Sequence, residues 1–289
     1  MNLWLLFTLA ATLLTAIERI LHRYVLRNND DASIYTLAYQ FAAAMFLVPT
    51  ILVEFKDYNF SPAHIPNYIL LIISGIFWLG FGLLSFHADR YAQVSITSIL
   101  SRTRLFWVLL IGLVFFDEVI NSYTVGGIIF IFIGITILAF ISLGGNRGVN
   151  KGALFSLMAA ISISIALSID KYQSQSSQLL LGMIALSAFL TPSAWLTVTL
   201  SDKKNRIKAL FAGKGKYVIF TALVGALSYW FLIKALSMAN ISKVIPIYQS
   251  SITVAIVMGF FFLKERDKIF FKLLASIIVV VGAVLVGLS

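Results

Sequence analysis

The chain has 289 residues, of which 60% are hydrophobic and only 12% are charged, and its formal net charge is +10. A soluble globular domain is about half apolar and a quarter charged, so this composition predicts an integral membrane protein. Because the chain has no cysteine and three scattered histidines, disulfide frameworks, thiol catalysis and a recognisable metal site are excluded. No P-loop motif occurs, so ATP hydrolysis is set aside and no cofactor is expected.

Ten apolar runs are long enough to cross a bilayer as helices, which takes about 17 to 25 residues each. The first run lacks the basic leading region of a cleaved signal and carries Glu18 and Arg19 near its end, so we expect a retained first span. The longest polar connection, 201–215, is too short to hold a core of its own. We place the spans at residues 3–26, 33–53, 67–87, 91–116, 122–142, 152–171, 178–200, 216–238, 241–263 and 268–288.

An internal repeat emerges when the chain is shifted by 147 positions, because residues 88–118 then lie over 235–265. Each half holds five spans, an odd number, so the two copies must be inverted in the membrane. We therefore expect an all-α membrane protein whose ten transmembrane helices form two inverted five-helix repeats, residues 1–145 and 146–289. The aligned identities are Ala88/Ala235, Ala92/Ala239, Ser95/Ser242, Gly112/Gly259, Phe115/Phe262 and Glu118/Glu265.

Two segments share a pattern of apolar helix, small residue, bulky run, Glu, polar turn and glycine-containing helix. They read LFWVLLIGLVFFDEVINSYTVGGIIFIFIGI and ITVAIVMGFFFLKERDKIFFKLLASIIVVVGAVL. In this pattern the whole chain resembles the drug/metabolite transporter superfamily, in its ten-helix, EamA-like branch. The resemblance implies a transporter and not an enzyme, but no particular substrate, since the superfamily moves amino acids, drugs, nucleotide sugars and sugar phosphates. The proline common early in the fourth span of the family is absent here, whereas the ninth span keeps Pro246.

The basic residues are divided unevenly between the two ends of the spans. Fifteen lie on the side that follows spans 1, 3, 5, 7 and 9, against four on the other side, Lys56, Lys171, Lys234 and Lys243. Cytoplasmic loops are enriched in Lys and Arg, so this count predicts that both termini lie outside. The family resemblance implies the reverse, with cytoplasmic termini. In either orientation we expect a multi-pass protein of a prokaryotic inner membrane.

Arg102 and Arg104 lie near the centre of the fourth predicted span, in SILSRTRLFW. In a lipid-facing position each arginine costs about 2.5 to 3.5 kcal/mol, so both need a polar environment. Residues two apart on a helix point about 200° away from each other. One arginine can therefore pair with an acid such as Glu18 or Asp170, while the other lines the cavity and meets an anion.

The repeat favours one assignment of the two arginines. Arg102 aligns with Gln249 in KVIPIYQSS, a stretch that contains Pro246 and Tyr248. Interrupted helices at the midplane commonly form transporter sites, although a proline can also mark only a packing kink. We predict that Arg102, Tyr248 and Gln249 bind the solute and that Arg104 is held by an acid on a neighbouring helix.

Other candidate solute contacts are polar or aromatic residues inside spans. Tyr39 and Gln40 interrupt the apolar second span, with interhelical hydrogen bonding as the alternative role. Lys243 lies one turn before Pro246 and adds positive potential. Glu18 and His22 share one helix face and are candidates for proton coupling or a charge pair, as is Asp170. Four aromatic residues form a candidate cage for an ammonium group, with ordinary packing as the alternative: Trp78, Trp107, Tyr229 and Trp230.

The leading hypothesis is a secondary transporter that moves a small anionic or zwitterionic solute by alternating access, such as a carboxylate, an amino acid or a phosphorylated metabolite. The alternative is a proton-coupled exporter of cationic drugs or amines that uses Glu18 and an aromatic cage. A membrane enzyme needs a cluster of acids, histidines or metal ligands, and a channel needs a selectivity ring; the sequence indicates neither. We expect the solute and the bilayer as partners, no nucleic acid, and a monomer, with a dimer as the alternative.

Overall fold

The computed structural model describes residues 2–25, 32–55, 62–91, 100–101, 103–118, 121–141, 151–176, 179–251, 253–255, 258 and 269–288. Within these ranges the regular structure is entirely helical. Six of the helices are long and apolar enough to cross a membrane, and three shorter apolar segments accompany them at Arg104–Phe115, Ser122–Gly134 and Ile277–Val286.

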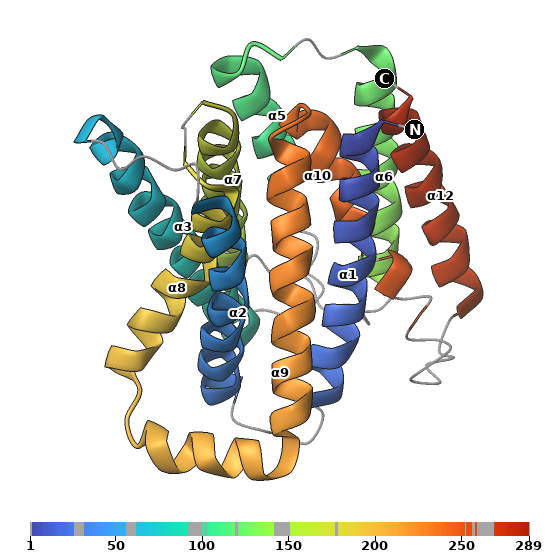
Figure 1. Ribbon diagram of the computed structural model, residues 1–289. Coiled ribbons are helices and arrows are strands. Elements are labelled where there is room, and N and C mark those ends of the chain that lie inside the picture. The colour runs from blue at the N-terminus through green and yellow to red at the C-terminus, as the bar shows by residue number, and fades with distance from the viewer. Residues whose placement is uncertain are drawn as a thin grey trace.

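Each of the ten predicted spans contains one principal helix of the described residues (Figure 1). The expectation of an all-helical protein is therefore confirmed. The first half holds α1 (Leu3–Val25), α2 (Ala32–Glu54), the short η3 (Pro62–His64), α3 (Ile65–Tyr91), α5 (Arg104–Phe115) and α6 (Ser122–Ile141). The second half holds α7 (Lys151–Ser176), α8 (Leu181–Thr199), α9 (Lys203–Leu236), α10 (Ile241–Gln249) and α12 (Ile269–Gly287).

The start of α9 differs from the prediction, because the expected polar connection 201–215 is helical from Lys203 onward. Ile207, Leu210 and Phe211 recur at helical spacing among lysines, which is the pattern of a helix that lies in a membrane interface. In Figure 1 the first turns of α9 lie across one end of the bundle, opposite the end that holds both termini. Lys214 ties this region to α1, since its Nζ donates to the carbonyl oxygen of Val25 over 2.5 Å.

The fourth span differs from the single helix that was expected, whereas the ninth is interrupted just after Pro246, where the sequence predicted a kink. Helix α5 begins at Arg104, directly after Thr103, so Arg104 lies at the start of a described helix and not in its middle. Helix α10 ends at Gln249, and Ser250 forms a turn there. The break follows Pro246, which lacks the backbone N–H of a normal helical residue. Arg102 lies outside the described residues.

Helices of one half pack against helices of the other throughout the bundle. Helix α1 packs on α9 and α10, α2 on α8 and α9, α3 on α7 and α8, α5 on α7, and α6 on α12. Glycines allow the backbones of α6 and α12 to approach each other closely. A Cβ on Gly127 would lie 2.6 Å from the carbonyl oxygen of Gly282, and a Cβ on Gly282 would lie 2.6 Å from that of Gly127. A side chain at either position would force the two backbones apart.

Two buried charges hold the corner between α9 and α10. Lys171 on α7 donates through Nζ to the carbonyl oxygens of Leu236 (2.8 Å) and Ala239 (2.5 Å), at the carboxyl end of α9. Glu118 accepts from the backbone N–H groups of Ile241 (2.7 Å) and Ser242 (3.1 Å), the first of α10. Each charge complements the partial charge of the helix end that it meets. Lys171, counted above as a basic residue of a loop, is therefore buried in the fold.

Candidate functional site

A cavity of about 390 Å³ lies between the two halves of the protein. Helices α1, α2 and α3 supply one part of its wall, and α8, α9 and α10 supply the other. The site therefore lies at the interface where an inverted-repeat protein is expected to bind its solute. Seven residues that the sequence singled out lie in the wall: Glu18, His22, Tyr39, Gln40, Trp78, Tyr229 and Tyr248.

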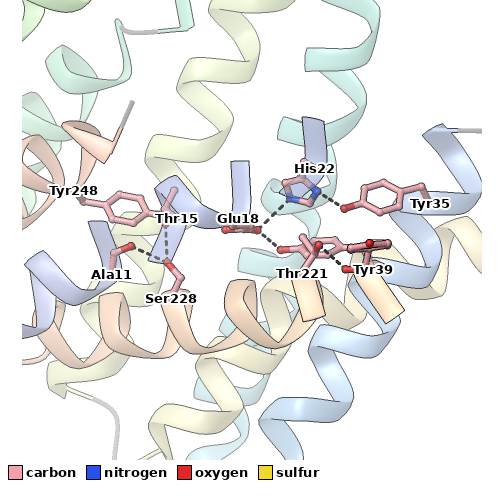
Figure 2. A network of polar contacts seen from close by, with 10 residues as sticks. Ala11, Thr15, Glu18, His22, Tyr35, Tyr39, Thr221, Ser228 and Tyr248 are labelled. Atoms are coloured by element: carbon pink, nitrogen blue, oxygen red, sulfur yellow. Dashed lines mark hydrogen bonds and ion pairs between the residues drawn. The ribbon is translucent and has the colours of Figure 1, made fainter. Parts of the chain in front are cut away.

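Glu18 is the centre of a polar network on one side of the cavity (Figure 2). Its Oε1 accepts a hydrogen bond from the hydroxyl of Tyr39 and lies 3.3 Å from Nε2 of His22. Nδ1 of His22 lies 2.5 Å from the hydroxyl of Tyr35. Oε2 of Glu18 has no hydrogen-bond partner among the described residues, and the side chain is 15% exposed. One carboxylate oxygen thus remains available to a ligand.

Gly225 on α9 makes room for this network. A Cβ at that position would lie 2.8 Å from Oε1 of Glu18, too close for two unbonded atoms. Because glycine has no side chain, the Glu18–Tyr39 pair can lie directly against the backbone of α9. A carboxylate of the first half is thereby packed on a helix of the second.

Aromatic rings form the opposite part of the wall. The ring of Tyr229 lies 5.1 Å from that of Trp78 at 87° and 5.8 Å from that of Phe189 at 86°. Phe189 in turn meets Tyr39 at 6.2 Å and 70°. Edge-to-face packing of this kind holds rings in fixed orientations, so the cavity has a rigid aromatic lining.

Asp170 lies outside the cavity and forms hydrogen bonds with two of the aromatic residues of its wall. The residue is fully buried on α7. Its carboxylate accepts hydrogen bonds from Ser74 Oγ (2.5 Å), Trp78 Nε1 (3.0 Å) and the hydroxyl of Tyr229. Three donors satisfy a carboxylate that would otherwise be costly to bury. These contacts make Asp170 a positioning residue for Trp78 and Tyr229, and it does not line the cavity itself.

A second chain of hydrogen bonds joins α10 to α1 and α9. The hydroxyl of Tyr248 lies 3.0 Å from Oγ1 of Thr15, which lies 2.6 Å from Oγ of Ser228. Ser228 donates to the carbonyl oxygen of Ala11 over 3.0 Å, as Figure 2 shows. Tyr248 is therefore held in the wall by hydroxyl groups from both halves.

The remaining candidates lie elsewhere. Arg104 donates through Nη2 to Oε1 of Gln249, so the contact it makes is with an amide where the sequence predicted an acid. Gln249 is buried, and neither residue lines the cavity. Trp230 packs its ring 5.4 Å from that of Phe231, and Lys243 lies early in α10; both are away from the cavity wall.

Sequence reasoning did not single out Tyr35, Phe189 and Gly225. Phe189 is an apolar residue in an apolar span, and Gly225 is one of 18 glycines, so neither carries a local signal. Tyr35 lies one turn before Tyr39, and this spacing was the available hint that both hydroxyls face α1.

Comparison with known proteins identifies the fold. The model of the EamA-like transporter family matches the chain twice, at residues 2–140 and 150–288. The chain belongs to the EamA-like transporter family. With the all-helical structure, this double match confirms the ten-helix, two-repeat architecture. An EamA-like chain with these apolar helices is a multi-pass membrane protein, and its family is one of transporters of small solutes.

A crystal structure of a protein that is 14% identical superposes on this EamA-like chain with a TM-score of 0.72, over 98% of both chains. At that level of identity the likeness concerns the fold alone. We found no match among curated proteins. The chemistry of the cavity must therefore be derived from the residues that line it.

Proposed function

We propose that this EamA-like protein transports a small organic solute that carries a protonated amine, bound in the cavity between Glu18 and the aromatic wall. The proposal rests on which residues line the cavity. Among the described lining residues Glu18 is the one carboxylate, and none is a lysine or an arginine. Of the two alternatives from the sequence, an amine at Glu18 fits this wall better than a solute that is only an anion.

The geometry supports recognition of an ammonium group in two ways. The available oxygen of Glu18 can accept one of its N–H bonds with charge assistance. Trp78 and Tyr229 offer aromatic rings, whose faces attract cations. A volume of about 390 Å³ suits a solute the size of an amino acid or a small drug.

Transport then follows from the position of the cavity between the halves. The halves rock around the site and expose it to each side of the membrane in turn. A carboxylate can hold a proton or an ammonium group, but not both, so proton exchange at Glu18 couples the two gradients. His22, next to Glu18, is the neighbouring group through which such a proton can pass. We place this transporter in a prokaryotic inner membrane, as a monomer.

Binding to the purified protein tests the proposal with three compounds of one carbon skeleton: leucine, isoamylamine, which lacks the carboxylate, and isocaproate, which lacks the amine. We expect isoamylamine to bind and isocaproate not to bind. Glu18→Gln should weaken amine binding at least tenfold, since it removes the counter-charge.

Asp202→Asn is the matched control, since it removes an exposed carboxylate far from the cavity. It should leave amine binding unchanged. Binding of isocaproate without isoamylamine, or full amine affinity in Glu18→Gln, would overturn the proposal.

A further inference from the structure

Arg104 is a half-buried cation without a carboxylate partner in the described part of the chain. Its Nη2 donates to Oε1 of Gln249, a neutral amide oxygen. Its Nε is inaccessible to solvent and has no hydrogen-bond partner among the residues that the structure describes. A guanidinium buried inside a membrane protein normally meets a counter-charge, because burying an unpaired ion is costly. The structure therefore leaves both a charge and a donor uncompensated.

Gln249 and Thr253 also have buried polar atoms without a hydrogen-bond partner among the described residues. Gln249 is 1% exposed, and its Nε2 is buried with no hydrogen-bond partner in the described ranges. Because Oε1 of Gln249 already accepts from Arg104, the amide can only donate further. Thr253, four residues after Gln249, has a buried Oγ1 that likewise has no hydrogen-bond partner among the described residues. This cluster of Arg104, Gln249 and Thr253 thus offers three unused donors and a positive charge.

The nearest charges strengthen the preference for an anion. Arg19 on α1 is close enough to Arg104 for the two guanidinium groups to repel each other. The charge of Glu18 acts electrostatically on Arg19 and on Tyr248. The one hydrogen-bonded oxygen of Glu18 contacts Tyr39 and His22. Among the described groups, an acid therefore acts on Arg19, whereas none acts on Arg104.

We propose that the Arg104–Gln249–Thr253 cluster is an anion-binding site, which takes a halide or a carboxylate group. A guanidinium, an amide N–H and a hydroxyl are the donors that such anions use. The anion is either a free ion or the carboxylate of the solute itself. Tyr248 lines the cavity and directly precedes Gln249, so a solute whose amine lies at Glu18 can extend toward the cluster. The idea that the solute supplies the carboxylate rests on the proposed function, whereas binding of a free ion does not.

Thermal unfolding of the full-length protein in detergent tests the site. Chloride is titrated against isethionate, a bulky sulfonate without a carboxylate group, at constant ionic strength. We expect the Tm to rise by about 3–6 °C for each tenfold increase in chloride above its dissociation constant, if the ion is free. If the solute supplies the anion, leucine should raise the Tm by more than isoamylamine does, and chloride should have no effect.

Gln249→Glu is the decisive variant, because it supplies a carboxylate at the place where the anion would bind. It should keep the Tm of the anion-bound wild type and lose the response to chloride and the preference for leucine. Arg104→Gln should lose both responses, and Gln249→Glu decides the question if that variant does not fold. Lys208→Gln, which removes an exposed cation on α9, should respond as the wild type does.

A wild type that responds neither to chloride nor to the carboxylate of leucine overturns the site, as does Gln249→Glu with unchanged responses. These results are separate from the test of the cavity. Isoamylamine binding and its loss in Glu18→Gln depend on the wall described above and not on Arg104.

Discussion

Asp170 illustrates how single residues shape the cavity without touching its contents. Its donors come from α3 and α9, while the residue itself lies on α7. The carboxylate thus fixes the rings of Trp78 and Tyr229 against each other from behind. Hydrogen bonds to a buried charged group are strong. Their loss should therefore lower the stability of the protein and change the positions of the two rings in the cavity wall.

Asp170→Asn should lower the stability of the protein by about 2 kcal/mol, since the amide has one acceptor oxygen and presents a donor where a donor already points. Amine affinity should fall severalfold as the rings lose their anchor. Thermal unfolding and isoamylamine titration measure the two effects. Asp117→Asn is the control, because Asp117 is exposed and asparagine tolerates its left-handed backbone. Equal behaviour of the two variants would contradict the positioning role.

At this scale, the sequence predicted those cavity residues whose type is unusual for the apolar span around them. Glu18, His22, Tyr39 and Gln40 interrupt apolar spans, and a polar group inside a bilayer must be paired or functional. Phe189 is the opposite case, because phenylalanine is ordinary in any span. The partner of a polar group also could not be predicted. Gln249 was matched to Arg102 through the repeat, whereas in the described structure it contacts Arg104.

At the scale of helices, the contact of α6 with α12 depends on small residues, among them Gly127 and Gly282. The backbones of Gly127 and Gly282 approach so closely that any side chain would collide with a carbonyl oxygen. Gly126, the neighbour of Gly127, has nothing within 4 Å of the position that its Cβ would occupy. Two adjacent positions of α6 thus differ in whether there is space for a side chain.

Gly127→Ala should destabilise the protein by about 1–3 kcal/mol, because the added methyl group forces α6 and α12 apart. Gly126→Ala should leave stability unchanged or raise it slightly, since alanine favours a helix more than glycine does. Thermal unfolding of the two variants side by side makes the comparison. A Gly127→Ala protein as stable as Gly126→Ala would show that the helices can separate without loss.

Helix positions followed from the hydrophobic runs, but the ends of helices did not. The first turns of α9 read as a polar connection because lysines dominate them, yet the apolar residues between the lysines recur at helical spacing. The corner between α9 and α10 depends on Glu118 and Lys171, which are far away in sequence. Helix ends are set by the groups that satisfy their free N–H and C=O groups, and here those groups come from other helices.

At the scale of the whole molecule, the orientation in the membrane follows from the distribution of charge. Both termini lie at one end of the bundle, and the basic first turns of α9 lie across the other (Figure 1). Six cations gather between Lys203 and Lys216, against a single acid, Asp202. Such a segment is attracted to the anionic lipids of a cytoplasmic leaflet. We therefore expect α9 to begin on the cytoplasmic side and both termini to lie outside.

Cysteine labelling in intact cells measures this orientation without background, because the natural chain has no cysteine. Lys204→Cys and Leu288→Cys place one exposed thiol at each end of the bundle. A membrane-impermeant maleimide should label Leu288→Cys directly and Lys204→Cys only after permeabilisation. The reverse pattern would favour the cytoplasmic termini that the family resemblance implies.

The sequence by itself determined that this protein is a helical membrane protein of two repeats, because bilayer thickness demands long apolar runs and repetition is visible as aligned residues. It also marked most polar residues of the cavity, because charge inside an apolar span is conspicuous. Only the tertiary structure decided that Glu18 meets Tyr39, that Asp170 stands behind the wall, and that Arg104 meets Gln249. Those pairings depend on how helices from the two halves pack, and packing distances carry no local sequence signal.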